Sequence, residues 1–170
     1  MKKTVTITID NTPLTCLENE SVLKVALDNK IDIPHFCYHE DLTIEANCRA
    51  CLVEEEATGK ITTSCDLRAK EGLKIKTKSA EIEKLRKKNI ELLLINHTQA
   101  CPKCIKGYFC KVAEQIKKYN VKALYKKVKT DYSIHKLGTA AELDPNICIS
   151  CNSCVKICEK IGVGFLHLEG

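Results

Sequence analysis

Cysteine is the residue type in this sequence whose number and spacing could do chemistry. The chain has 12 cysteines in 170 residues, and all but Cys16 fall into three blocks. The N-terminus runs from Lys3 directly into an alternating strand pattern without an apolar leader, which predicts a cytoplasmic protein with no secretory signal. Thiols stay reduced in that compartment, and the cysteines therefore indicate metal binding rather than disulfides.

The first block reads Cys37-x10-Cys48-x2-Cys51-x13-Cys65. Four thiolates with one tight Cys-x2-Cys pair suit a [2Fe–2S] cluster, in which two sulfurs bind each iron. A structural zinc ion is the alternative, but four-cysteine zinc sites often use two Cys-x2-Cys pairs and this block has one. Spacing favours the iron–sulfur cluster and leaves zinc open.

The second block reads His97-x3-Cys101-x2-Cys104-x5-Cys110. One imidazole and three thiolates can enclose either a zinc ion or a [4Fe–4S] cluster, and spacing alone does not decide between them. An imidazole in place of a thiolate would make the cluster less negative. By analogy with histidine-ligated Rieske centres, His97 would raise the reduction potential of such a cluster.

The third block reads Cys148-x2-Cys151-x2-Cys154-x3-Cys158, which is the spacing of bacterial ferredoxins. Zinc does not need this triple spacing, so the block predicts a [4Fe–4S] cluster. The pattern departs from ferredoxins at Glu159, where they carry proline. In two-cluster ferredoxins the last cysteine serves the other cluster, and this sequence has no second run. We expect Cys158 to complete its own cluster, with a thiolate from a partner subunit as the alternative.

Three further cysteine and histidine residues lie outside these ligand sets: Cys16, His35 and His39. Cys16 lies in an alternating strand pattern and is expected to be a small buried core residue. The two histidines flank Cys37, where the cysteine set is complete without them. We therefore expect both imidazoles at the surface or beside the ligands rather than on the metal.

Local patterns predict that residues 1–80 form a mostly β domain with one helix. Val5, Ile7 and Ile9 alternate, and a turn at residues 10–11 leads into a returning strand over 14–17. Ser21 is predicted as the N-cap of a helix over 22–29. Further strands are expected over 51–55, 59–62 and 73–77, the last of which closes the sheet.

The remaining residues are predicted to form three segments. Residues 81–121 carry apolar side chains at helical spacing, including Leu92, and then Val112, Ile116 and Tyr119. Residues 122–144 are polar and weakly patterned, as in a linker. Residues 145–170 form a compact cysteine-rich segment.

These motifs together resemble a known family. Residues 33–40 (IPHFCYHE) and 48–54 (CRACLVE), followed by Cys65, resemble the plant-ferredoxin-like domain of the large iron–sulfur subunit of respiratory complex I, a domain also found in NAD-linked [FeFe] hydrogenases and formate dehydrogenases. Residues 92–97 (LLLINH) with the second block resemble that family's [4Fe–4S] segment. The third block with residues 160–164 (KIGVG) resembles the start of its ferredoxin-type domain.

The resemblance implies an α+β protein with three parts. They are a β-grasp [2Fe–2S] domain over 1–80, a helical [4Fe–4S] domain over 81–121 with one histidine and three cysteine ligands, and a partial ferredoxin-type [4Fe–4S] segment over 145–170. It implies one [2Fe–2S] and two [4Fe–4S] clusters. The sequence shows no site for a flavin or a nicotinamide and no catalytic constellation. We expect a non-catalytic electron-transfer subunit of an oxidoreductase complex.

Such a subunit would relay single electrons between a flavin-containing NAD(P)H-oxidising subunit and a catalytic partner. The resemblance implies a hydrogenase, a formate dehydrogenase or a ferredoxin-reducing partner, in some complexes with electron bifurcation. The rival hypothesis is a zinc-stabilised interaction or nucleic-acid-binding module, which the net charge of +5 could support. Three clusters with their thiolates carry about −5 in total, which would cancel that charge. We therefore expect no nucleic-acid partner, and no apolar run is long enough for a membrane span.

Overall fold

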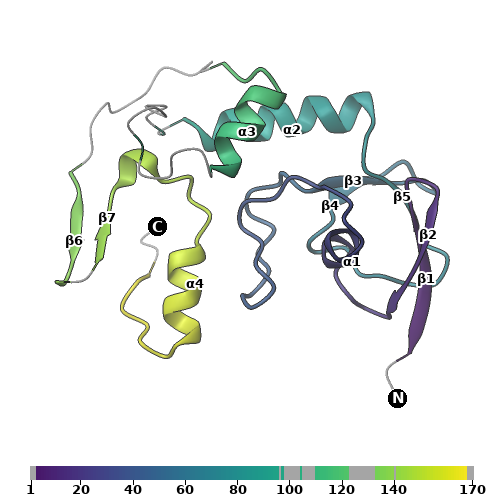
Figure 1. Cartoon of the computed structure of the whole chain (residues 1–170), viewed down its shortest axis with the longest axis horizontal. Helices are drawn as coiled ribbons and strands as arrows, with labels where there is room; N and C mark the ends of the chain where they lie inside the picture. Colours follow the sequence, from purple (N-terminus) through teal and green to yellow (C-terminus); the bar gives the residue numbers. More distant parts are fainter. Residues whose placement is uncertain are drawn as a thin grey trace. The chain divides into compact units, whose positions relative to one another are not determined.

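The computed structural model describes residues 3–95, 97, 104, 110–122, 133–139 and 141–167. The chain divides into two compact units, one formed by residues 1–86 with 152–170 and the other by residues 87–151. Figure 1 shows the helices and strands along the chain. Their bounds are β1 (Thr4–Ile9), β2 (Thr12–Leu17), α1 (Val22–Asp28), β3 (Leu52–Glu55), β4 (Ile61–Thr63), β5 (Lys74–Lys76), α2 (Ala80–Leu93), α3 (Lys111–Lys118), β6 (His135–Leu137), β7 (Ala141–Leu143), the 3-10 helix η3 (Pro145–Ile147) and α4 (Ser153–Lys160).

The first unit contains a mixed five-stranded sheet with the order β2-β1-β5-β3-β4. The β1–β2 hairpin pairs Thr4 with Leu17, and its turn uses Asp10 and Asn11 at φ 47° and 67°. Two consecutive residues with positive φ match the twist of a tight hairpin, and Asn and Asp tolerate this conformation well. Strand β5 completes the sheet, as expected. It lies in the centre, parallel to β1 and antiparallel to β3, and so joins the two hairpins.

The core of this unit lies between the sheet and α1. The alternating side chains of Val5, Ile7 and Ile9 are 2% exposed or less, and they cluster with Leu23 and Val25 of α1. The period of two in β1 therefore sends one face of the strand into the core, as the sequence pattern predicts. The predicted mixed α+β class is confirmed.

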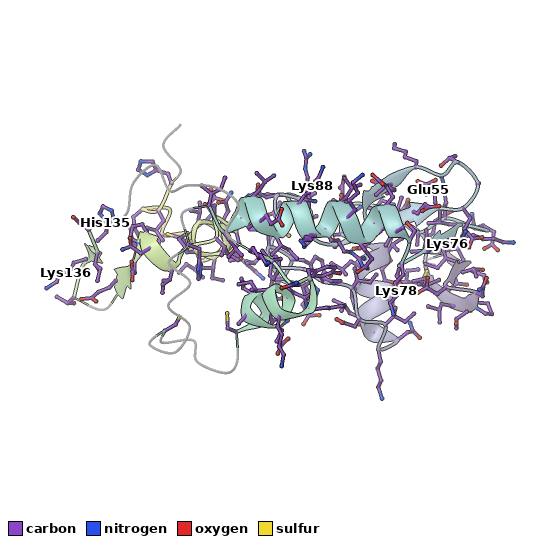
Figure 2. All side chains as sticks on the ribbon, turned by 90° about the horizontal axis from the view of Figure 1, so that it is seen from above. Glu55, Lys76, Lys78, Lys88, His135 and Lys136 are labelled. Atoms are coloured by element: carbon purple, nitrogen blue, oxygen red, sulfur yellow. The ribbon has the colours of Figure 1, made fainter. Side chains whose placement is uncertain are left out.

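The second unit is built from the later part of α2, from α3 and from the β6–β7 hairpin. Helix α2 ends at Leu93, and Leu92, one of the apolar residues at helical spacing, is 51% exposed. Figure 2 shows Lys88 projecting from the exposed face of α2. Residues 135–137 and 141–143, expected as part of a linker, instead pair as the hairpin β6–β7, and Gly138, with φ 76°, follows β6.

None of the helices within the described ranges has the length and apolar character needed to cross a bilayer.

Candidate iron–sulfur centres

The four thiols of the first block are buried together in the first unit. Cys37 and Cys48 lie in the long connection between α1 and β3, Cys51 immediately precedes β3, and Cys65 follows β4. Each of the four residues is 3% exposed or less. Because β3 and β4 are paired, the sheet brings Cys51 and Cys65 together although they are distant in sequence.

These thiols are arranged as two pairs. The sulfur atoms of Cys37 and Cys48 are 3.3 Å apart, and the hydrogen bond from Cys37, together with backbone hydrogen bonds, lowers the pKa of Cys48 to about 6. A hydrogen bond from the thiol of Cys65, with help from Ser64, lowers the pKa of Cys51 to about 7. The donor thiols keep their protons, and their hydrogen bonds and burial raise the pKa of Cys37 and of Cys65. Each pair thus presents one thiolate near neutral pH, and thiolates are the form that binds metal.

The loop that carries the first pair adopts an unusual backbone conformation. Ala46 and Arg49 have φ values of 52° and 46°, the left-handed region that is uncommon for residues with a Cβ. The amide of Cys48 donates to the Cys37 sulfur at 3.4 Å, and a backbone hydrogen bond involving Ala50 lowers the pKa of Cys48. Strained backbone that turns amides toward sulfur is the kind of preorganisation expected at a ligand loop.

The turn that carries Cys65 is held by the beginning of α1. Ser21 is the residue before the helix, as expected, but its side chain caps no helix amide. Its hydroxyl instead donates to the Cys65 carbonyl at 2.9 Å, while the amide of Leu23 donates to the carbonyl of Ser64 at 2.9 Å. Ser64 is fully buried, and its hydroxyl donates to the Cys51 carbonyl at 2.8 Å. These serines fix the backbone of two predicted ligands, a role that sequence reasoning missed.

The three residues placed outside the ligand sets take the following positions. His39 is 60% exposed, and its ring accepts a hydrogen bond from the Asp41 amide. The Nδ1 atom of His35 lies 2.8 Å from the Ile33 carbonyl. Cys16 packs against the core but is only partly buried, less than expected, because β2 is an edge strand.

The second block flanks the helices of the second unit. His97 follows the end of α2, and its amide donates to the Leu94 carbonyl at 3.1 Å. Cys110 is the residue before α3, and both Cys104 and Cys110 are partly buried. Cys101 lies outside the described residues, so the four predicted ligands are not described as one set.

The third block surrounds the start of α4. Cys148 follows η3, and the amide of Ser150 donates to its sulfur at 3.3 Å. Cys148 and Cys154 are exposed, whereas Cys158, near the end of α4, is 3% exposed. The boundary between the two units falls after Cys151, so each half of this run is described within its own unit. Within the described residues, no three histidine, cysteine or acidic side chains converge as ligands of a single ion would.

Sequence reasoning also missed two buried cations. Arg86 is 2% exposed, donates from Nη2 to the Leu52 carbonyl at 2.6 Å, and pairs with Glu83 at 3.2 Å. Its helical spacing from Ile82 could have marked the position as buried. Lys156 is 3% exposed, and its only signal was its position inside the third cysteine block.

Two family models match the chain. Residues 2–80 match a 2Fe-2S iron-sulfur cluster binding domain, and residues 86–123 match the NADH-ubiquinone oxidoreductase-G iron-sulfur binding region. The first match covers the first block and confirms an iron–sulfur domain over this part of the chain, in which the four cysteines stay the predicted ligands. The third block lies outside both matched ranges.

Full-length relatives and a solved structure agree with these matches. NADH dehydrogenase [ubiquinone] iron-sulfur protein 1 of Solanum tuberosum is 34% identical over 164 residues, covering 95% of this chain and 22% of that protein. The mitochondrial NADH-ubiquinone oxidoreductase 78 kDa subunit of Candida albicans is 31% identical over 92% of this chain and 22% of its own length. A crystal structure of NAD+-reducing [NiFe]-hydrogenase in the H2-reduced state matches with a TM-score of 0.88 and 29% identity, covering 98% of this chain and 70% of that chain.

The fold, the buried thiols and these matches define an iron–sulfur protein of electron transport. The chain belongs to the family of the large iron–sulfur subunit of complex I, the NADH–ubiquinone oxidoreductase, and it corresponds to the iron–sulfur region of that family. It spans about a fifth of the length of these relatives, 22% in each case.

Proposed function

We propose that this chain is an electron-transfer subunit that holds three iron–sulfur clusters and relays single electrons within an oxidoreductase complex. The observation that carries the proposal is the set of four buried thiols in two pairs, within residues that match a 2Fe-2S cluster binding domain. Iron–sulfur clusters exchange one electron at a time, so a chain without a catalytic constellation can still link two redox partners.

The paired thiols fit a [2Fe–2S] cluster in a β-grasp domain. Two sulfurs bind each iron of such a cluster. We assign Cys37 and Cys48 to one iron and Cys51 and Cys65 to the other, because the structure brings them together in these pairs. Each pair already contains a thiolate, and the loop amides already point at sulfur. Both features lower the free-energy cost of binding the cluster at this site.

Two [4Fe–4S] clusters complete the proposed set. His97, Cys101, Cys104 and Cys110 would hold one, supported by the match over residues 86–123. Cys148, Cys151, Cys154 and Cys158 would hold the other, supported by the ferredoxin spacing and by the amide of Ser150 directed at the Cys148 sulfur. Amide donors of this kind stabilise the negative charge of a ligated thiolate.

The partners are proposed by analogy with the family. The name of one relative, the NADPH-Fe(3+) oxidoreductase subunit alpha of Geobacter sulfurreducens, which is 30% identical over 92% of this chain and 19% of its own length, also describes a nicotinamide-linked oxidoreductase. We propose a cytoplasmic complex in which a flavin-containing NAD(P)H-oxidising subunit lies on one side of the electron path. A hydrogenase, a formate dehydrogenase or a ferredoxin-reducing subunit would lie on the other, including in complexes that bifurcate electrons.

Metal analysis tests the cluster assignment. Anaerobically reconstituted chain should contain about 10 iron atoms, from 2 + 4 + 4, with matching sulfide. Cys48→Ser should remove the [2Fe–2S] signal from electron paramagnetic resonance (EPR) spectra, whereas the matched control Cys16→Ser should keep all signals because Cys16 lies outside the ligand sets. Zinc instead of iron at the first block would overturn the proposal.

A reduction assay tests the relay. NADH alone should leave the clusters of the isolated chain oxidised, since a chain that only relays electrons has no flavin to accept a hydride, and dithionite should reduce them. Addition of a flavin-containing NADH dehydrogenase component should make NADH effective. Direct reduction by NADH would contradict a purely electron-transferring role.

A further inference from the structure

Lys156 is a buried cation that connects the third cysteine block to the first. It lies on α4 between Cys154 and Cys158 and is 3% exposed. Its ammonium group donates to the Cys37 carbonyl at 3.0 Å and to the Thr43 carbonyl at 3.3 Å. Helix α4 and the loop that carries Cys37 and Thr43 both belong to the first unit. The side chain thus reaches the backbone of a proposed [2Fe–2S] ligand.

Within the described residues, this buried charge has no carboxylate partner. Its ammonium group contacts the two carbonyl oxygens, whereas Arg86, the other buried cation among the described residues, pairs with Glu83 at 3.2 Å. Burying a cation is costly unless an opposite charge compensates it. The region around Cys37 supplies such a charge when the site is loaded, because four thiolates and an oxidised [2Fe–2S] core carry about −2 together.

We propose that Lys156 is a positioning residue for the [2Fe–2S] site, serving as its buried counter-charge and raising its reduction potential. The inference rests on the proposed assignment of Cys37 as a ligand. Reduction adds one negative charge, and a nearby fixed cation favours that step. The same ammonium group fixes the Cys37–Thr43 loop, so Lys156 couples the fold of α4 to the geometry of the first site.

The expected magnitude follows from Coulomb's law. At an effective dielectric constant of about 20, a unit charge within about 10 Å of the cluster changes the equilibrium constant for its reduction by about tenfold or more. Removal of the charge should therefore lower the equilibrium constant for one-electron reduction by about tenfold. For one electron this corresponds to a midpoint potential about 59 mV more negative.

Lys160 provides a matched control on the same helix. Its ammonium group donates to the Asp41 carbonyl at 2.6 Å and pairs with the Asp41 carboxylate at 3.5 Å, so it binds the same loop one helical turn later. Its side chain is 50% exposed and its charge is already paired. Solvent and Asp41 screen this charge, and its removal should leave the potential nearly unchanged.

The test is an anaerobic redox titration of the full reconstituted chain, followed by EPR of the reduced [2Fe–2S] cluster, for wild type, Lys156→Met, Lys156→Arg and Lys160→Met. We expect the potential of Lys156→Met to become more negative by the stated shift, with Lys156→Arg close to wild type because the charge is kept. If Lys156→Met fails to bind the cluster, Lys156→Gln takes its place, because the glutamine side chain is neutral but keeps a hydrogen-bond donor.

The outcomes separate the inference from the proposed function. An unchanged potential in the neutral variants, or an equal shift in Lys160→Met, would overturn the role of Lys156 while the [2Fe–2S] assignment stands. A wild-type chain without a [2Fe–2S] signal would instead overturn the assignment itself. A loss of order in the loop without a change in potential would assign Lys156 a structural role only.

Discussion

Ser21 offers a sharp test of how the first site is held, because the sequence pattern and the structure assign it different roles. As a helix cap, its hydroxyl would accept hydrogen bonds from α1 amides. In the structure it donates to the Cys65 carbonyl at 2.9 Å, and the first amides of α1 bond to carbonyls of residues 64 and 67 instead. Among the described residues, no other donor to the Cys65 carbonyl is found. Ser21→Ala should therefore leave a buried acceptor unsatisfied.

The cost of this change can be worked out from the contacts. An unsatisfied buried acceptor costs about 1–3 kcal/mol, so Ser21→Ala should destabilise the first unit by about 2 kcal/mol. For a domain of this size, the melting temperature should fall by about 10 °C. Ser64→Ala should cost less, about 1 kcal/mol, because the Cys51 carbonyl keeps the Ser64 amide at 2.8 Å.

Ser21→Asp distinguishes the two roles. Aspartate caps helices about as well as serine, so a capping role predicts little change. An ionised carboxylate cannot donate to a carbonyl and would lie beside one, so the structure predicts a larger loss than in Ser21→Ala, while Ser21→Thr keeps the donor. Thermal unfolding of anaerobic holo protein, followed by circular dichroism and by visible cluster absorption, measures each variant. Wild-type stability of Ser21→Asp would refute this reasoning.

Three further predictions concern the cysteines. The pKa values of Cys48 and Cys51, about 6 and about 7, lie below the ordinary 9.0, so their thiolates should stabilise the folded apo chain at pH 8. This stabilisation should be lost as the pH falls through 7 and 6, because the thiolates then become protonated. Equal urea midpoints of the apo chain at pH 6 and pH 8 would contradict this prediction. Chelation of iron should preserve part of the β-rich domain and remove protease resistance beyond about residue 97, since clusters supply much of the folding free energy there. Equal digestion of apo and holo chains in that region would argue against this. Cys158→Ser should abolish or convert one [4Fe–4S] EPR signal, whereas an unchanged spectrum favours a ligand from a partner subunit.

Much of the fold could be predicted from local patterns. The alternation of Val5, Ile7 and Ile9 marks a strand with one buried face, and the structure buries all three. The hairpin turn and α1 fall where the turn residues and the apolar spacing place them. The central place of β5 was not predictable in this way, because strand order depends on pairing between distant segments rather than on local propensity.

The sequence by itself determined the chemistry of this protein, since the types and spacing of its cysteines restrict the choice of cofactor and the motifs around them identify the family. Only the tertiary structure decided how the first four thiols pair, that Ser21 holds the Cys65 turn, and that Lys156 is buried against the Cys37 loop. The spacing of the predicted ligands can be read from the sequence, because the residues of one cysteine block lie in one stretch of chain. The supporting contacts join residues up to 119 positions apart, and only the burial of the core brings them together.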